Sequence, residues 1–339
     1  MFPAFNRGRV LGAAFSVLLL TGPAYAASDL STLERAAQAG NADAQVLLGA
    51  RYERGDGVEQ DKAQALAWFL KAAGQNDAVA QFNVAVLYEH GEGVTQDWPK
   101  ALSYYRKSAD RGFVNAQFQL GAIYQYGRGD TKNLKEAAHW YALAAKQGFA
   151  GAQNRLGLLY EEGEAVSQSY AEAAALYLKA AEQGDPAAQF NLARLYADGK
   201  GVVQDQSKAV HWYRKAAEQG ESYAQHNMGV FYQHGAGVAR DPAEAAVWYR
   251  KAAEQGRTSA QFNLGMLYVR GEGVAQDYSA AAKWFRLAAE QGHAGGQSSL
   301  GNLYFMGEGV PKDHSQSIFW WEKAAAQGDS VARANLERF

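Results

Sequence analysis

The sequence predicts an all-α fold, an α-solenoid of eight 36-residue helix-turn-helix repeats with helical caps, and three observations carry that prediction. A glutamine recurs every 36 residues, a tyrosine follows each glutamine by seven residues, and a glycine follows each tyrosine by three. The glutamines are Gln45, Gln81, Gln117, Gln153, Gln189, Gln225, Gln261 and Gln297. Such periodicity is typical of arrays in which each unit buries its apolar face only by stacking on its neighbours.

The first helix of each repeat, helix A, follows the pattern A-Q-x-x-L-G-x-x-Y. Its apolar residues are spaced by three, four and seven, which predicts an amphipathic helix. A turn of the type Gly91-Glu92-Gly93-Val94 comes next, and glycine adopts the left-handed conformation that ends a helix. The chain is therefore expected to reverse after each helix A.

The second helix, helix B, reads A-x-x-W-Y-x-K-A-A and closes at a glycine or, once, at Asn76. An aspartate placed as its N-cap precedes it in most repeats. These aspartates are Asp61, Asp97, Asp205, Asp241, Asp277 and Asp313. We expect the helix B tryptophans and the helix A tyrosines, among them Tyr196, to be core residues.

The domain order begins with a predicted signal peptide at residues 1–26, which has Arg7 and Arg9, an apolar stretch and an Ala24-Tyr25-Ala26 cleavage site. A capping helix is expected at 27–40 and another at 329–339. The predicted repeats are 41–76, 77–112, 113–148, 149–184, 185–220, 221–256, 257–292 and 293–328. The apolar stretch is shorter than the roughly 20 residues that span a bilayer, so we expect no stable membrane insertion after cleavage.

The whole pattern, A-x-A-Q-x-x-L-G-x-x-Y-x-x-G-x-G-V-x-x-D followed by A-x-x-W-Y-x-K-A-A-x-Q-G, resembles the Sel-one-like repeat of the tetratricopeptide-like superfamily. The resemblance implies antiparallel helix pairs in a right-handed superhelix, helix A on the concave side, and a role as adaptor or regulator of protein complexes. Bacterial members are often exported. Asp130 in the third repeat, and Ala165 and Ser169 in the fourth, depart from the pattern, so those turns are expected to differ in shape.

Composition argues against several function classes. The 33 Lys and Arg nearly balance the 35 Asp and Glu, which disfavours nucleic acid as a partner. The chain has no Cys, and it lacks S-x-x-K, G-x-S-x-G, H-E-x-x-H and phosphate-loop patterns. We therefore expect no catalytic residues and no cofactor, and a hydrolase such as a β-lactamase-like relative is only the second alternative.

Three histidines of helix A deserve a test as metal ligands, namely His90, His226 and His234. A metal site needs three or four ligands converging at about 2 Å. Because His90 and His234 stand four repeats apart, we interpret them as solvated or hydrogen-bonded and expect no metal site.

The candidate binding residues lie on helix A. An aromatic follows the glutamine in several repeats, where a ladder for a peptide or sugar competes with helix packing as the explanation. Residues two, five, eight and nine after the glutamine vary freely, and by resemblance to the tetratricopeptide fold these positions line the groove. The predicted groove residues are Phe82, Glu89, His90, Phe118, Tyr126, Arg194, His226, His234, Met266 and Arg270.

The favoured function is an exported, non-catalytic scaffold that binds a protein or peptide partner of the bacterial envelope in its concave groove. It is expected to be periplasmic or secreted. The main alternative is a binder of cell-wall or exopolysaccharide glycan, in which groove aromatics stack on sugar rings. Tryptophan in the groove would favour that alternative, but most tryptophans stand on helix B.

Overall fold

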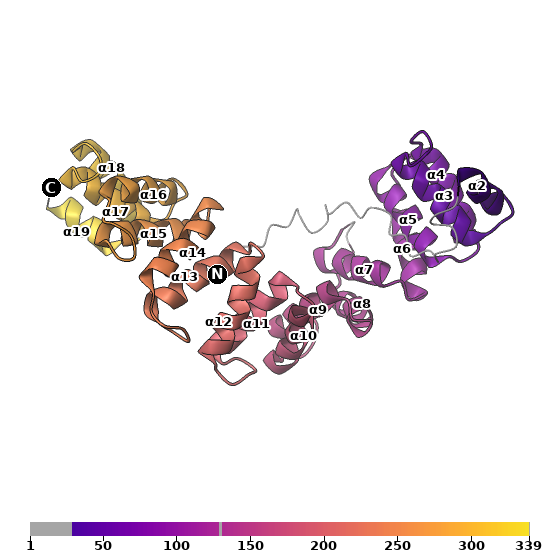
Figure 1. The fold of residues 1–339 in the computed structure, drawn as a ribbon, viewed down its shortest axis with the longest axis horizontal. Coiled ribbons are helices and arrows are strands. Elements are labelled where there is room, and N and C mark those ends of the chain that lie inside the picture. Colours follow the sequence, from indigo (N-terminus) through magenta and orange to yellow (C-terminus); the bar gives the residue numbers. More distant parts are fainter. Residues whose placement is uncertain (1–28, 129–130, 339) are drawn as a thin grey trace. The chain divides into compact units, whose positions relative to one another are not determined.

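The computed structural model describes residues 29–128 and 131–338, and every regular element in them is an α-helix (Figure 1). Consecutive helices pack in pairs, which confirms the predicted all-α solenoid. The signal peptide and Asp130 lie outside the described residues.

Each repeat contributes two helices of 13 residues. The A helices are α3 (Ala42–Arg54), α5 (Ala78–His90), α7 (Val114–Tyr126), α9 (Ala150–Glu162), α11 (Pro186–Asp198), α13 (Ser222–His234), α15 (Thr258–Arg270) and α17 (Ala294–Met306). The B helices are α4 (Lys62–Gly74), α6 (Trp98–Asp110), α8 (Leu134–Lys146), α10 (Tyr170–Glu182), α12 (Gln206–Glu218), α14 (Pro242–Glu254), α16 (Tyr278–Glu290) and α18 (His314–Ala326). Shorter helices flank them, α2 (Leu30–Gln38) and α19 (Ser330–Glu337).

The chain forms two compact units. The first ends at Ala152 and the second begins at Gln153, so the division falls within α9. The first unit therefore contains the first three repeats and the second unit contains nearly all of the other five.

The helix ends use the predicted caps. The Asp97 carboxylate accepts a hydrogen bond from the Lys100 backbone N–H at 3.0 Å, and the other predicted aspartates cap their helices in the same way. Helix B ends at left-handed residues such as Gly112, with φ of 86°, and Asn76, with φ of 67°. These observations confirm the predicted start and end of helix B.

The turn of the fourth repeat does differ from the others. Gly93 and Gly201 have φ of 69°, whereas Ala165 at the equivalent position is not left-handed, because Asn76 alone among the described non-glycine residues has a positive φ. Ser169 still caps α10 by accepting from the Glu172 backbone N–H at 3.2 Å. The departure in sequence thus changes the turn but keeps the helix start.

Helix A and helix B of one repeat meet where an aromatic ring of helix B lies on a glycine of helix A. A methyl group added to Gly121 would lie 2.4 Å from the ring of Tyr141, and one added to Gly229 would lie 2.5 Å from that of Tyr249. Both tyrosines are fully buried. At these two positions glycine is therefore required by close packing, since even a methyl group would clash with the ring.

Most of the helix A tyrosines are less buried than expected. Tyr196 is half-buried, and the Lys208 ammonium lies 5.3 Å from its ring, so its prediction as a core residue is wrong. Tyr213 of helix B is buried in this repeat. The hydroxyl of several helix A tyrosines instead accepts a hydrogen bond from an arginine of the preceding helix B. These pairs are Arg106–Tyr124, Arg214–Tyr232, Arg250–Tyr268 and Arg286–Tyr304.

The helix B tryptophans follow the prediction more closely. Trp140, Trp212, Trp248 and Trp320 are buried, while Trp68 and Trp284 are half-buried. The core is thus built from aromatic rings and alanines of helix B together with aliphatic residues and alanines of helix A.

The periodic glutamine joins successive repeats through its side chain. Gln225 donates from Nε2 to the backbone carbonyl of Ala217 at 3.1 Å, and its Oε1 accepts from Nε2 of Gln255 at 2.7 Å. One buried amide thereby connects the helix B of its own repeat to the helix B before it. A buried amide requires such partners, which explains why this position does not vary.

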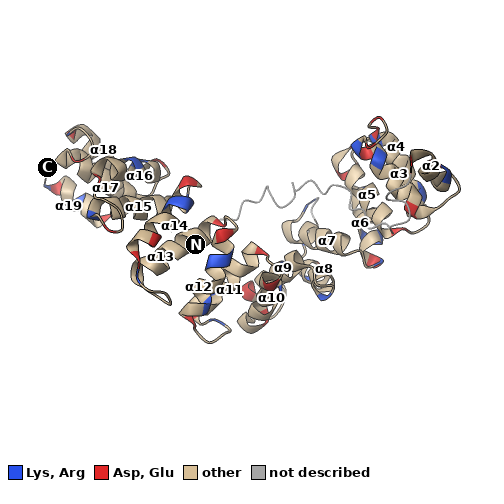
Figure 2. Ribbon diagram, viewed as in Figure 1, with Lys and Arg blue, Asp and Glu red and all other residues tan. Residues whose placement is uncertain are grey.

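Charges of both signs are interspersed along the helices of each unit (Figure 2). Among the helices described, none has the length and apolarity needed to cross a membrane.

Candidate functional site

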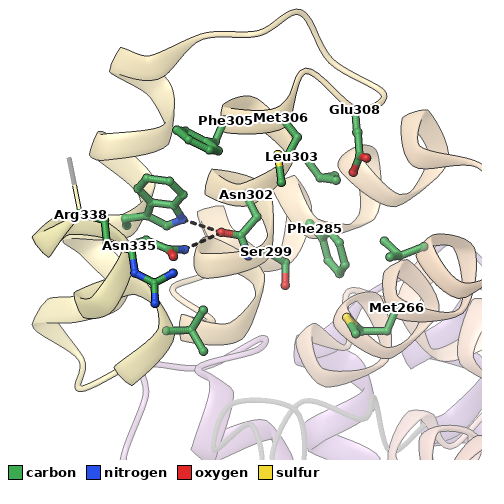
Figure 3. Close-up of a pocket in the computed structure, with 13 residues that line it drawn as sticks. Met266, Phe285, Ser299, Asn302, Leu303, Phe305, Met306, Glu308, Asn335 and Arg338 are labelled. Carbon is green, nitrogen blue, oxygen red and sulfur yellow. Dashed lines mark hydrogen bonds between the residues drawn. The ribbon is translucent and has the colours of Figure 1, made fainter.

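The variable positions of helix A surround a pocket in the seventh and eighth repeats, here called the terminal pocket (Figure 3). Its volume is 540 Å³. The lining residues are Met266 and Val269 of α15, Phe285 of α16, Ser299, Asn302, Leu303, Phe305 and Met306 of α17, Glu308, Trp321 of α18, and Val331, Asn335 and Arg338 at the C-terminal helix. Most of these side chains are apolar.

An amide network forms one wall of the terminal pocket. Oδ1 of Asn302 accepts from Nε1 of Trp321 at 2.9 Å and from Nδ2 of Asn335 at 2.8 Å (Figure 3). These bonds connect α17 to α18 and to α19. The wall is thus fixed in position before any ligand arrives, which limits the ordering cost of binding.

The rim of the pocket leaves large apolar side chains in solvent. Met306 is 64% exposed and Val331 is 54% exposed, whereas Phe285 and Leu303 are buried beneath. A concave apolar surface with a few fixed polar groups suits an apolar side chain of a bound segment, and the flexible thioether of methionine adapts to its shape.

Of the predicted groove residues, Met266 lines this pocket, and Arg270 is exposed at the end of the same helix. Tyr126, at the end of α7, is 38% exposed. His90 and His234 are exposed at the ends of α5 and α13. These four exposed residues are distributed over different repeats, and only Met266 lies in the terminal pocket.

Phe82 is buried, which corrects its prediction as a groove residue. Its ring packs edge-on against Tyr105 at 5.5 Å and against Phe113 at 5.3 Å between centroids. Phe118 is half-buried in an equivalent arrangement, 4.9 Å from Phe149. The aromatic after the glutamine therefore packs between repeats, and neither ring is left free to stack on a ligand.

The prediction for Glu89 is also corrected, because it was expected to line the groove at a position that varies freely. It is 2% exposed, accepts a hydrogen bond from the Tyr105 hydroxyl and forms an ion pair with Arg128. The Arg128 guanidinium lies 5.1 Å from the ring of Trp98. Glu89 thus holds α5 against α6 and against the segment after α7.

Arg194 shows the same behaviour in the fourth and fifth repeats. Its guanidinium bonds both carboxylate oxygens of Glu161 at 2.6 Å, and the Tyr177 hydroxyl donates to the same carboxylate at 3.0 Å. Both charged side chains are largely buried. Arg194, predicted as a groove residue, is therefore engaged by a side chain of the preceding repeat.

His226 occupies the position that holds phenylalanine in several other repeats. Its ring lies 5.6 Å from that of Tyr249, and its Nδ1 is buried without a hydrogen-bond partner. Burial lowers the pKa of His226 to about 4, and the nearby Arg257 adds to the effect. The imidazole is thus neutral at pH 7. Across the residues that the structure describes, no group of three acidic or histidine side chains is placed to hold a metal ion.

Sequence reasoning missed most of the terminal pocket. The signal was present at the eighth position after the glutamine, where Glu53, Glu89 and Glu161 give way to Val269 and Phe305 in the last two repeats. At this position Glu89 and Glu161 accept internal hydrogen bonds, whereas Val269 and Phe305 line the pocket.

The comparisons with known proteins agree with this architecture. A family model of the Sel1 repeat matches residues 42–77, 78–113, 114–149, 150–185, 186–221, 222–256, 258–293 and 294–329. The chain belongs to the Sel1 repeat family. Each matched segment starts one residue after the start of the repeat predicted above. Sel1 repeats form scaffolds typical of protein–protein interaction and are generally non-catalytic.

Two solved Sel1 repeat structures resemble the chain along most of its length. One is c5321, a protective antigen of uropathogenic Escherichia coli strains, with 38% identity, a TM-score of 0.87, and coverage of 91% of this chain and 66% of that one. The other is a Sel1 repeat protein from Oxalobacter formigenes, with 34% identity, a TM-score of 0.69, and coverage of 91% and 90%. The chain thus spans just under two thirds of the first relative. Among curated proteins, none matches the sequence.

Proposed function

We propose that this Sel1 repeat protein is an exported, non-catalytic scaffold that binds an apolar segment of a partner protein in its terminal pocket. The observation that carries the proposal is the exposed apolar rim, Met306 and Val331, above a buried apolar floor. Exposed apolar side chains around a preformed pocket are the usual anchor sites of protein interfaces.

The fixed amides of Asn302 and Asn335 complement this apolar surface. Polar groups beside an apolar pocket orient a peptide backbone while a side chain fills the pocket. A glycan is less well served, because the indole of Trp321 is 2% exposed and offers no open face to a sugar ring.

The experiment starts from peptides selected on the full chain from a displayed random library. A fluorescein-labelled selected peptide is titrated with wild type and Met306→Asp by fluorescence polarisation. The aspartate would be buried against the bound peptide, so the variant should bind at least tenfold more weakly. Because Met306 is exposed in the free protein, the unfolding midpoint should not change.

The double variant Lys215→Glu and Lys251→Glu is the matched control, since both lysines are exposed on helix B. Loss of binding in this control with full affinity in Met306→Asp would place the binding surface on helix B and refute the proposal.

Export is a separate part of the proposal and rests on residues 1–26. Mass spectrometry of the protein from a bacterial host should find a chain that begins at Ala27 in the periplasmic or secreted fraction. An intact Met1 on membrane-bound protein would refute export with cleavage.

A further inference from the structure

The hydrogen bond between two glutamine side chains that recurs along the array is missing from one repeat, which leaves a gap. In seven repeats, Nε2 of a glutamine at the end of helix B donates to Oε1 of the helix A glutamine 30 residues earlier, at 2.7–2.8 Å. The donors are Gln75, Gln147, Gln183, Gln219, Gln255, Gln291 and Gln327. In the second repeat the donor position holds Arg111.

The gap leaves a buried acceptor without a donor. Gln81 is 2% exposed, and its Nε2 donates to the Ala73 carbonyl at 3.4 Å, but its Oε1 has no hydrogen-bond partner. Buried carbonyl oxygens in native proteins are rarely left in this state. The site therefore lacks an N–H or O–H group that the other repeats supply from within.

A cavity lies at the same place, here called the second-repeat cavity. It has a volume of 660 Å³ and is lined by Gln81 together with Leu70, Tyr104, Lys107 and Arg111, among others. By equivalence with the other repeats, it includes the space that a glutamine side chain fills elsewhere. The presence of arginine instead of glutamine at position 111 thus accounts for both the missing donor and the cavity.

The cavity also presents two cations. Lys107 and Arg111 are exposed, and within residues 29–128 and 131–338 neither takes part in an ion pair. The Lys107 ammonium lies 4.8 Å from the ring of Tyr104. The cavity thus offers a buried acceptor, two cationic groups and an apolar wall formed by Leu70 and Tyr104.

We propose that the second-repeat cavity binds the C-terminal residue of a peptide chain. That residue carries an N–H and a carboxylate on one Cα. The N–H donates to Gln81 Oε1, the carboxylate pairs with Arg111 and Lys107, and the side chain packs against Leu70 and Tyr104. A guanidinium binds a carboxylate through two parallel hydrogen bonds, which gives this arrangement its directionality.

Other anions fit less well. A phosphate diester has no donor for Gln81 Oε1, and Asp110 on the cavity wall disfavours a polyanion. The cavity lies on α4, α5 and α6, whereas the terminal pocket lies on α15 to α19. Because the two sites share no residue, the inference does not depend on the proposed function, and either can fail alone.

The test compares two fluorescein-labelled Gly-Ser-Gly-Leu peptides, one with a free carboxylate and one with a C-terminal amide, by polarisation on the full chain. The free acid should bind at least tenfold more tightly. Arg111→Gln restores the glutamine pair, so it should weaken binding of the free acid at least tenfold without lowering the unfolding midpoint. Arg240→Gln, at an exposed arginine outside the cavity, should bind as wild type does.

Equal binding of acid and amide, full affinity in Arg111→Gln, or no binding to wild type would each overturn the proposal. So would a high-resolution structure of the peptide-free protein in which the Arg111 guanidinium itself donates to Gln81 Oε1, because the cavity would then be filled by the chain's own side chain.

Discussion

The same helix A positions are used in two different ways in the molecule. In the second, fourth and fifth repeats, Glu89, Glu161 and Arg194 are withdrawn into contacts with neighbouring helices. In the seventh and eighth repeats, the equivalent residues Val269, Phe305 and Met266 line an open pocket. Variation in a repeat array therefore does not by itself mark a binding surface, since a variable residue also serves to join one repeat to the next.

The largest expected difference between the two regions is in stability. Glu89→Ala removes the acceptor of the buried Tyr105 hydroxyl and the partner of Arg128, and should lower the free energy of unfolding by about 2–4 kcal/mol. Met306→Ala is the control and should change it by less than about 0.5 kcal/mol. Urea unfolding of both variants measures this difference. Equal effects would mean that Glu89 is not engaged as described.

His226 provides a pH-dependent test. Its folded pKa of about 4 lies below the ordinary 6.5, so the unfolded chain binds this proton more readily, and stability falls as the pH drops through that window. His226→Phe removes the titrating group. Between pH 7 and pH 4, the variant should lose about 2 kcal/mol less unfolding free energy than wild type. Parallel pH profiles for the two proteins would contradict the burial of the imidazole.

A smaller difference in stability is expected between two helix A arginines, Arg194 and Arg270. Arg194→Ala leaves the largely buried Glu161 carboxylate without its cation and should cost about 1–2 kcal/mol. Arg270→Ala, at an exposed helix end, should cost less than about 0.5 kcal/mol. Thermal and urea unfolding distinguish the two. An Arg194→Ala variant as stable as wild type would show that this side chain does not hold the repeats together.

The fold was predictable because its determinants are local and repeated. The glutamine, the small helix A residue, the turn glycine and the cap aspartate recur at fixed spacing, and each acts within one repeat or between adjacent ones. The burial of Tyr196 was predicted wrongly, because an invariant position was equated with a core position. In the structure, several such tyrosines act through their hydroxyl groups.

The candidate site was less predictable for a different reason. Glu161 and Arg194 are separated by 33 residues, and Glu89 and Arg128 by 39, so each pair joins different repeats. Both residues of each pair stand at positions that vary between repeats, and the sequence pattern does not indicate that one residue pairs with the other. The terminal pocket likewise combines α15, α17 and α19, and its amide network becomes evident only in three dimensions.

Methyl NMR of the methionines shows whether a partner segment binds the terminal pocket of the last repeats. Met266 and Met306 line the terminal pocket, whereas Met228 is fully buried in the sixth repeat and serves as internal control. The chain is labelled with ¹³C-methyl methionine and titrated with a library-selected peptide carrying a C-terminal amide, so that the second-repeat cavity takes no part. The Met266 and Met306 resonances should shift in a saturable manner, while the Met228 resonance should stay in place. A peptide that binds with the same affinity but leaves Met266 and Met306 unmoved would contradict it.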